Sequence, residues 1–311
     1  MTKKEINIIE TCSKNINQFI KYIKILGPKG FAEFRPYKFQ IKLLRKFANS
    51  WENRRTEKHN HIVVGPRQSG KTTALAVYAL WYLLFNSDKC IGLLSYKHSI
   101  SKEILLRIKE IYNNLPDFLK QDVVRNTKEQ FKLANGSYIF TATMCAARSV
   151  RGKTVDLLLF DEAAFTSDSD FDEFIWSVFP AQVARANSQM IMISTPHGDN
   201  QFYKIYKHAI SGVSSFIATR LRYNCVPGRD EKFKEKVIRD NGRAFFEQEY
   251  NASFIISKEI PGDEKIVIKV NTNPLSPDEA KGFIEKLKEL YSKKLDIKTI
   301  KNKTEYEIEY I

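Results

Sequence analysis

Residues 61–73 read HIVVGPRQSGKTT, and this stretch decides the fold. Within it, residues 65–72 fit the pattern G-x-x-x-x-G-K-[ST] in full. A short apolar strand at 61–64 precedes the pattern, and the apolar run ALAVYALWYLLF (74–85) follows it. Strand, glycine-bearing loop and helix are the context that a phosphate-binding loop needs. A chance match in a loop is the competing interpretation, and the flanking strand and helix argue against it.

The loop predicts a binding site for ATP and Mg²⁺. Backbone N–H groups of such a loop point at the β-phosphate, and the next helix adds its positive N-terminal end. We expect Lys71 to bridge the β- and γ-phosphates and the Thr72 hydroxyl to take one Mg²⁺ position. The other residues expected around the nucleotide are Gly65, Pro66, Arg67, Gln68, Ser69, Gly70 and Thr73.

A second apolar strand supplies the carboxylates that the phosphate loop itself does not contain. Residues 155–162 read VDLLLFDE, so two acids follow a buried strand, where ligands of open α/β sheets bind. We expect Asp161 to hold Mg²⁺ through water and Glu162 to orient and deprotonate the attacking water. Strands often end in charges at the surface, so this signal is strong only in combination with the upstream loop. Asp156 fits a strand-entry residue better than a catalytic one.

Three further groups are candidates. Ser194 and Thr195 end the apolar strand 189–194 and could sense the γ-phosphate, or they could cap the next helix. Tyr37 and Gln40, in RPYKFQ, could stack on and pair with adenine. A packed tyrosine and an exposed glutamine is the alternative for that pair.

Arginines near the site could stabilise the charge of a phosphoryl-transfer transition state, in cis or from a neighbouring subunit. Arg67 is the best placed, because the loop itself carries it to the phosphates. Arg148 and Arg151 precede the acidic strand, and each could equally be a surface or DNA-contacting residue.

The order of elements predicts an α/β fold with a mainly parallel sheet flanked by helices. Apolar strands at 91–96, 155–160 and 189–194 alternate with helical segments, which is typical of a sheet covered on both faces. Amphipathic helices are expected at 5–26 and 99–114, a further helix at 37–51, and a hairpin at 130–133 and 137–142.

Charge and composition divide the chain near residue 257. Residues 258–311 hold 11 Lys and 11 Asp or Glu, so the whole net charge of +14 lies in residues 1–257. That excess favours an anionic partner such as nucleic acid, although a merely basic soluble surface would look the same. The tail is expected to be a small strand–helix–strand unit of unknown role. No apolar run reaches about 18 residues and no signal-peptide core follows the N-terminus, so we expect a soluble intracellular protein.

Taken together, the motifs resemble a known family. RPYKFQ, GPRQSGKTT, SVRG before VDLLLFDEAAF, and MISTPHG follow in the order of the ATPase domain of tailed-phage terminase large subunits. The stretch VPGRDEKFKEKVIRDNGRAFFEQEYNASFI resembles the segment leading towards that family's nuclease. The resemblance covers about residues 20–256 and implies a P-loop NTPase fold of the RecA/ASCE type in residues 1–257. Residues 1–55 would be its lid and adenine-contact region.

The resemblance implies a motor that packages double-stranded DNA into a procapsid in the cytoplasm of an infected bacterium. Its implied partners are the portal protein, a small terminase subunit and copies of itself in a ring. It implies that Arg67 is the arginine that stabilises the transition state and that Ser194 and Thr195 form the coupling element. It also makes Arg148 or Arg151 a candidate for reaching the site of a neighbouring subunit. The family's second half is an RNase H-like nuclease, and the 258–311 tail is too short for it, so we expect no nuclease activity from this chain.

Two other interpretations stay open. A superfamily 2 helicase shares the Gln element, the GKT and the DE pair, but it needs a second RecA-like lobe, for which the residues after Pro196 are too few. A nucleotide-gated DNA-binding protein without turnover is the other, and the intact set of Lys71, Thr72, Asp161 and Glu162 argues against it.

Overall fold

The computed structural model describes residues 1–27, 29–54, 58–143, 154–178 and 188–255, and the backbone of three later strands. The chain divides into two compact units, Met1–Ile255 and Ile256–Ile311. In the second unit β11 (Ile266–Asn271) and β12 (Leu295–Ile300) both pair antiparallel with β13 (Glu305–Tyr310). The strand at 295–300 was absent from the sequence prediction. The predicted helix between the strands lies outside the described residues.

The first unit is built on an eight-stranded sheet of order β10-β3-β9-β8-β4-β7-β6-β5. The strands from β10 to β7 run parallel, and β6 and β5 complete the sheet antiparallel. This confirms the mainly parallel α/β fold. The bounds are β3 Asn60–Val64, β4 Cys90–Ser95, β5 Val123–Asn126, β6 Gln130–Leu133, β7 Tyr138–Thr143, β8 Leu157–Asp161, β9 Gln189–Ser194 and β10 Phe216–Arg220.

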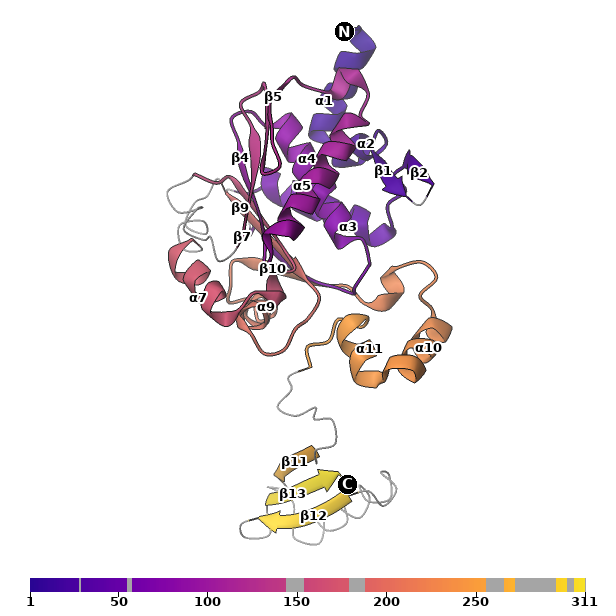
Figure 1. Cartoon of the computed structure of the whole chain (residues 1–311), viewed down its shortest axis with the longest axis vertical. Helices are drawn as coiled ribbons and strands as arrows, with labels where there is room; N and C mark the ends of the chain where they lie inside the picture. The colour runs from indigo at the N-terminus through magenta and orange to yellow at the C-terminus, as the bar shows by residue number, and fades with distance from the viewer. Residues whose placement is uncertain are drawn as a thin grey trace. The chain divides into compact units, whose positions relative to one another are not determined.

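Helices cover both faces of this sheet (Figure 1). Alternate residues of a strand point to opposite faces, so in β8 Leu157 and Leu159 join one core cluster while Leu158 and Phe160 join another. The first cluster lies under α3 (Lys38–Glu52), α4 (Lys71–Phe85) and α5 (His98–Asn113). The second is covered by α7 (Asp168–Ser177) and α9 (Gln201–Ile210). The continuous apolar sequence of β8 follows from burial on both faces.

The helix that follows the phosphate loop, α4, is enclosed along its length. Residues 74–84 are all buried, because α3, α5 and the sheet surround the helix. Its C-terminal carbonyls accept hydrogen bonds from side chains of the distal loops. Asn135 Nδ2 donates to the carbonyls of Leu83 (2.9 Å) and Asn86 (3.2 Å), and Gln121 Nε2 donates to that of Leu84 (2.8 Å). The end of α4 is therefore fixed to the segment that leads into β5, β6 and β7.

The N-terminal region differs from the single helix predicted for residues 5–26. The structure has α1 (Lys3–Lys14) and α2 (Ile16–Ile20), followed by a hairpin of β1 (Lys24–Gly27) and β2 (Gly30–Glu33). The break is at Asn15, whose backbone is extended (φ −144°) and whose side chain caps α2 by accepting from the N–H of Asn17. Asparagine favours such caps over helix interiors, so the apolar spacing alone was misleading.

A small helical layer ends the first unit: α10 (Glu231–Asn241) and α11 (Arg243–Glu249). Its own apolar cluster is formed by Tyr223, Val237 and Phe246. Short 3₁₀ turns lie at Asp117–Leu119, Ala163–Phe165 and Tyr223–Cys225. In the part of the chain that the structure describes, none of the helices combines the length and the apolarity needed to cross a bilayer.

Candidate active site

The phosphate loop joins the end of β3 to the start of α4, at the edge of the sheet where the parallel strands end. Gly70 has φ 86°, which is in the left-handed region. A β-carbon added at this residue would lie only 2.7 Å from Nε2 of Gln40. A side chain at residue 70 would therefore be strained and would clash. The pattern's second glycine is explained by this turn, and Lys71 begins α4 directly after it.

Lys71 is folded into its own loop. Its Nζ donates to the carbonyls of Gly65 (3.1 Å) and Pro66 (2.7 Å), and only 6% of the residue is exposed. Burial lowers the pKa of the Lys71 ammonium, against the opposing charges of Glu162 and Asp161. Ser69 Oγ also donates to the Pro66 carbonyl, at 2.8 Å. A phosphate oxygen would replace these carbonyls as the partner of the ammonium.

Asp161 meets the loop through Thr72. The Thr72 hydroxyl donates to Asp161 Oδ2 at 2.8 Å, and Oδ1 is buried with no hydrogen-bond partner among the described residues. An alcohol and a carboxylate oxygen side by side are donors that Mg²⁺ accepts, usually with waters and substrate phosphates. The pair fits that ion, since the orphaned oxygen offers a further ligand. The described residues contain no cluster of three or more His, Cys, Asp or Glu that could hold a metal alone.

The buried carboxylate also sets a pH dependence of stability. Burial, followed by the charge of Glu162, raises the pKa of Asp161 to about 6. A carboxyl whose folded-state pKa is raised destabilises the fold increasingly as pH rises from about 4 to about 6, and fully above that.

We therefore expect Asp161→Asn to raise the free energy of unfolding of the protein, measured without nucleotide or Mg²⁺, by about 1–3 kcal/mol at pH 7.5. The gain shrinks towards pH 5, and urea unfolding across this range measures it. A difference that is constant with pH would mean that packing, and not charge, is responsible.

Glu162 stands beside the end of β9. It has φ 52°, a left-handed conformation that is strained for a non-glycine residue and often marks a functional site. Ser194 Oγ and Thr195 Oγ1 donate to Glu162 Oε2 at 3.4 and 3.5 Å. The Ser194 carbonyl accepts from the N–H of Gly65 at 3.0 Å. The end of β9 thus touches both the second acid and the first residue of the phosphate loop.

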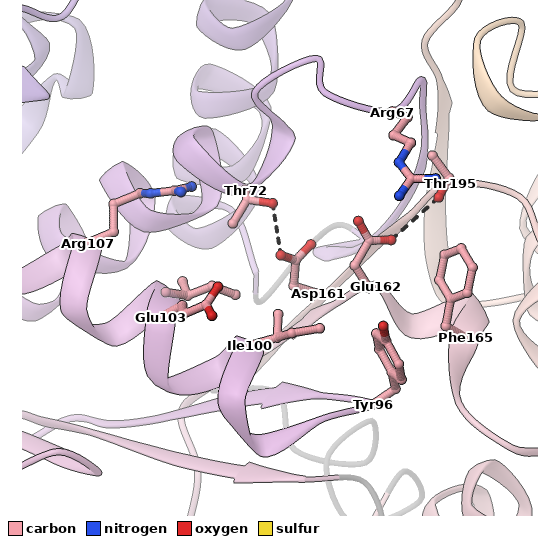
Figure 2. Close-up of a pocket in the computed structure, with 11 residues that line it drawn as sticks. Arg67, Thr72, Tyr96, Ile100, Glu103, Arg107, Asp161, Glu162, Phe165 and Thr195 are labelled. Carbon is pink, nitrogen blue, oxygen red and sulfur yellow. Dashed lines mark hydrogen bonds between the residues drawn. The ribbon is translucent and has the colours of Figure 1, made fainter. Parts of the chain in front are cut away.

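These groups share a cavity of about 320 Å³ (Figure 2). The sequence-predicted residues in its wall are Arg67, Thr72, Asp161, Glu162 and Thr195. Sequence reasoning missed the other lining residues, which are Tyr96, Ile100, Glu103, Ile104, Arg107 and Phe165. Most of these residues follow β4, which pairs directly with β8. The strand predicted at 91–96 therefore could have indicated them, because ligands bind at the carboxyl ends of neighbouring parallel strands.

Arg67 is engaged by the helical layer. Its Nη1 lies 3.5 Å from Glu249 Oε2, and its backbone N–H donates to the Glu249 carbonyl at 2.7 Å. The Arg67 side chain is 65% exposed, whereas that of Glu249 is 9% exposed. The Arg67 end of this ion pair is open to solvent, so water and salt screen the charge and the guanidinium can exchange this partner for another anionic group.

The two residues expected to contact adenine, Tyr37 and Gln40, differ from each other in burial. The ring of Tyr37 is partly exposed beside Phe39, with ring centroids 6.0 Å apart. Gln40 is buried: its Oε1 accepts from the N–H of Tyr37 (2.8 Å) and its Nε2 donates to the Gly70 carbonyl (2.9 Å). Its amide therefore links α3 to the phosphate loop.

Of the other residues considered from the sequence, Thr73 and Asp156 lie away from the main cavity. Thr73 lines a smaller hollow with Arg107 and the β1–β2 hairpin, not the main cavity. Arg148 and Arg151 lie outside the described residues. Asp156 is not at the site: its Oδ2 accepts from the N–H of Cys90 at 2.9 Å, as expected for a strand-entry residue.

Comparison with known proteins assigns the chain to a family. A family model described as "Terminase large subunit, T4likevirus-type, N-terminal" matches residues 62–299. The large terminase subunit of Escherichia phage T5 is 32% identical over 133 residues, which cover 42% of this chain and 30% of that protein. This chain thus spans less than a third of the length of that relative.

Solved structures show the same fold. The large terminase ATPase domain of Thermus phage P74-26 has a TM-score of 0.57 at 20% identity, covering 71% of this chain and 95% of that one. The HK97 bacteriophage large terminase has a TM-score of 0.58 at 16% identity, covering 89% and 58%. The large terminase of a thermophilic bacteriophage, in complex with ATP-gamma-S, has a TM-score of 0.53 at 13% identity, covering 82% and 73%.

Proposed function

This chain belongs to the terminase large subunits of the T4-like-virus type, N-terminal region, and we propose that it is an ATP-hydrolysing motor subunit that moves double-stranded DNA into a procapsid. The observation that carries the proposal is the convergence of Thr72, Asp161 and Glu162 on one cavity beside the phosphate loop. The large terminase of the thermophilic bacteriophage is described in complex with ADP and with ATP-gamma-S, which supports nucleotide binding in general by proteins of this fold.

In this proposal the phosphate loop binds the nucleotide and orients it. Lys71 exchanges the Gly65 and Pro66 carbonyls for β- and γ-phosphate oxygens, and Thr72 and Asp161 hold Mg²⁺. When bound, the ion neutralises charge on the transferred phosphoryl group. Tyr37 stacks on the base, and Gln40, which holds the loop to α3, keeps one amide hydrogen free to donate to the base.

Glu162 takes the proton of the attacking water, which the Ser194 and Thr195 hydroxyls help to place by fixing the carboxylate. Loss of the γ-phosphate changes the position of Glu162, and Ser194 passes that change through its carbonyl to Gly65. This contact is the proposed coupling between hydrolysis and movement. Arg67 leaves Glu249 to stabilise the transition state, and Arg148 or Arg151 reaches the site of the next subunit.

The motor works as a ring on the portal protein, together with a small terminase subunit, in the cytoplasm of the infected host. The net charge of +14 supports contact with DNA phosphates. A packaging motor must grip any sequence, so contacts to the backbone suit it better than base readout.

ATP hydrolysis with and without double-stranded DNA, at rising salt, tests the proposal. We expect Mg²⁺-dependent hydrolysis that DNA stimulates, with DNA affinity falling about 10-fold between about 50 and 200 mM salt for as few as two phosphate contacts. Lys71→Ala, which removes the buried ammonium, serves as the background control. Stimulation that is insensitive to salt would contradict backbone contact, and absence of hydrolysis even with a portal ring present would contradict the motor.

A further inference from the structure

Arg229 lies against the outside of the phosphate loop. It precedes α10, and its Nη1 donates to the carbonyl of Arg67 at 3.0 Å while its Nη2 donates to that of Gln68 at 3.1 Å. One guanidinium therefore holds two consecutive carbonyls of the loop. No motif of the sequence indicates this contact, since the residues are separated by more than 160 positions.

The geometry of the peptide bond gives this contact a consequence for the other side of the loop. In a trans peptide the C=O of one residue and the N–H of the next point in opposite directions. Because the carbonyls of residues 67 and 68 point at Arg229, the N–H groups of Gln68 and Ser69 point away from it. Those are N–H groups that a phosphate-binding loop presents to an anion.

The conformation that Arg229 holds is strained at Gln68. This residue has φ 51°, in the left-handed region that glycine adopts readily and other residues adopt at a cost. A loop with glutamine at this position needs an external contact to stay in that conformation. The two hydrogen bonds from Arg229 flank the strained residue and supply such a contact.

Arg229 is itself held in place. Its guanidinium carbon lies 5.5 Å from the ring centre of Phe233 and 5.2 Å from that of Tyr250, so two aromatic faces orient the fork. Among the described residues no carboxylate forms an ion pair with it. Its charge also reaches Lys71, whose pKa it helps to lower. The guanidinium is thus a fixed positive group at the phosphate loop.

We propose that Arg229 is a positioning residue for nucleotide binding: it fixes the peptides at 67–69 so that the loop's N–H groups are aimed at phosphate before the nucleotide arrives. The inference rests on the proposed function of the loop as an ATP site. It assigns the segment that leads into α10 a role in nucleotide affinity through this side chain. Arg229 acts through the loop backbone and takes no part in the chemistry.

Calorimetric titration with Mg·ADP, using the full chain, tests this. Arg229→Ala is expected to bind about 10-fold more weakly than wild type, because without its two hydrogen bonds the free loop leaves the binding conformation and the nucleotide has to restore it. Arg229→Lys is expected to bind almost as weakly, since an ammonium keeps the charge but cannot hold both carbonyls. Arg239→Ala removes an exposed arginine of α10 and should bind like wild type.

The decisive variant combines Arg229→Ala with Gln68→Gly. Glycine adopts φ 51° without strain, so the double variant should recover affinity to within about 3-fold of Gln68→Gly alone. A structural role in folding of the helical layer would not be rescued at residue 68. Thermal unfolding without nucleotide accompanies each titration, so a poorly folded variant is recognised.

Three results would overturn the inference: wild-type affinity in Arg229→Ala, wild-type affinity in Arg229→Lys, or a double variant that binds no better than Arg229→Ala. Failure of the proposed function looks different. In that case the wild-type chain does not bind Mg·ADP, or Lys71→Ala binds it equally well, whatever residue 229 is.

Discussion

Glu162→Gln is expected to lower the rate of ATP hydrolysis about 1,000-fold while ATP affinity stays within a few-fold of wild type. The amide keeps the size of the side chain and can still accept from the Ser194 and Thr195 hydroxyls, but it cannot take a proton from water. Steady-state turnover and equilibrium binding of ATP, measured on the same preparation, separate the two effects.

A matched control is available on the surface. Glu235→Gln changes an exposed acid of α10 and should leave turnover unchanged. If Glu162→Gln abolished ATP binding as well, Glu162 would be structural. If turnover survived the change, another carboxylate would have to be the base, and Glu103, which also lines the cavity, is the next candidate.

Arg67→Ala is expected to lower the maximal rate by about 1,000-fold, with a much smaller effect on ATP affinity. In the structure the guanidinium pairs with Glu249 and borders the cavity, so it has to move before it can meet the transferred phosphoryl group. An interaction that is made only in the transition state changes the maximal rate rather than ground-state binding.

Arg67→Lys distinguishes charge from shape. Lysine lacks the planar fork, so it should restore little of the rate. The backbone N–H of residue 67 still donates to Glu249 in both variants, which leaves the loop's attachment in place. A rise in KM without a change in the maximal rate would make Arg67 a binding residue and would leave the transition state without a cis arginine.

The sequence predicted those parts of the site that are encoded in short, continuous segments. The phosphate loop and the acids at 161 and 162 are each short segments whose residue types are dictated by a strand end and a helix start. The parallel order of the buried strands then brings them together, since the carboxyl ends of β3 and β8 lie at one edge of the sheet with only β9 between them.

The rest of the site depends on contacts that no local pattern encodes. Glu249 meets Arg67 across 182 positions, and Arg107 reaches the cavity only because β4 lies next to β8. The sequence allows Gln40 to be either an adenine contact or an exposed helix residue, and it does not indicate that the side chain is buried against Gly70, where the lack of a β-carbon leaves room for its amide. The break at Asn15 shows the converse, since one capping side chain overrides an apolar spacing that predicts a continuous helix.

The phosphate loop lies at the N-terminal end of α4, a helix that is enclosed along most of its length. Its 15 residues at about 1.5 Å each give a length of about 22 Å, and the far end is bonded to Gln121 and Asn135. Burial of residues 74–84 and the hydrogen bonds at the C-terminal end restrain the helix against fraying and bending. We therefore expect any displacement of Lys71 along the helix axis to move α4 as a rigid body, together with the Gln121 and Asn135 side chains that are bonded to its far end.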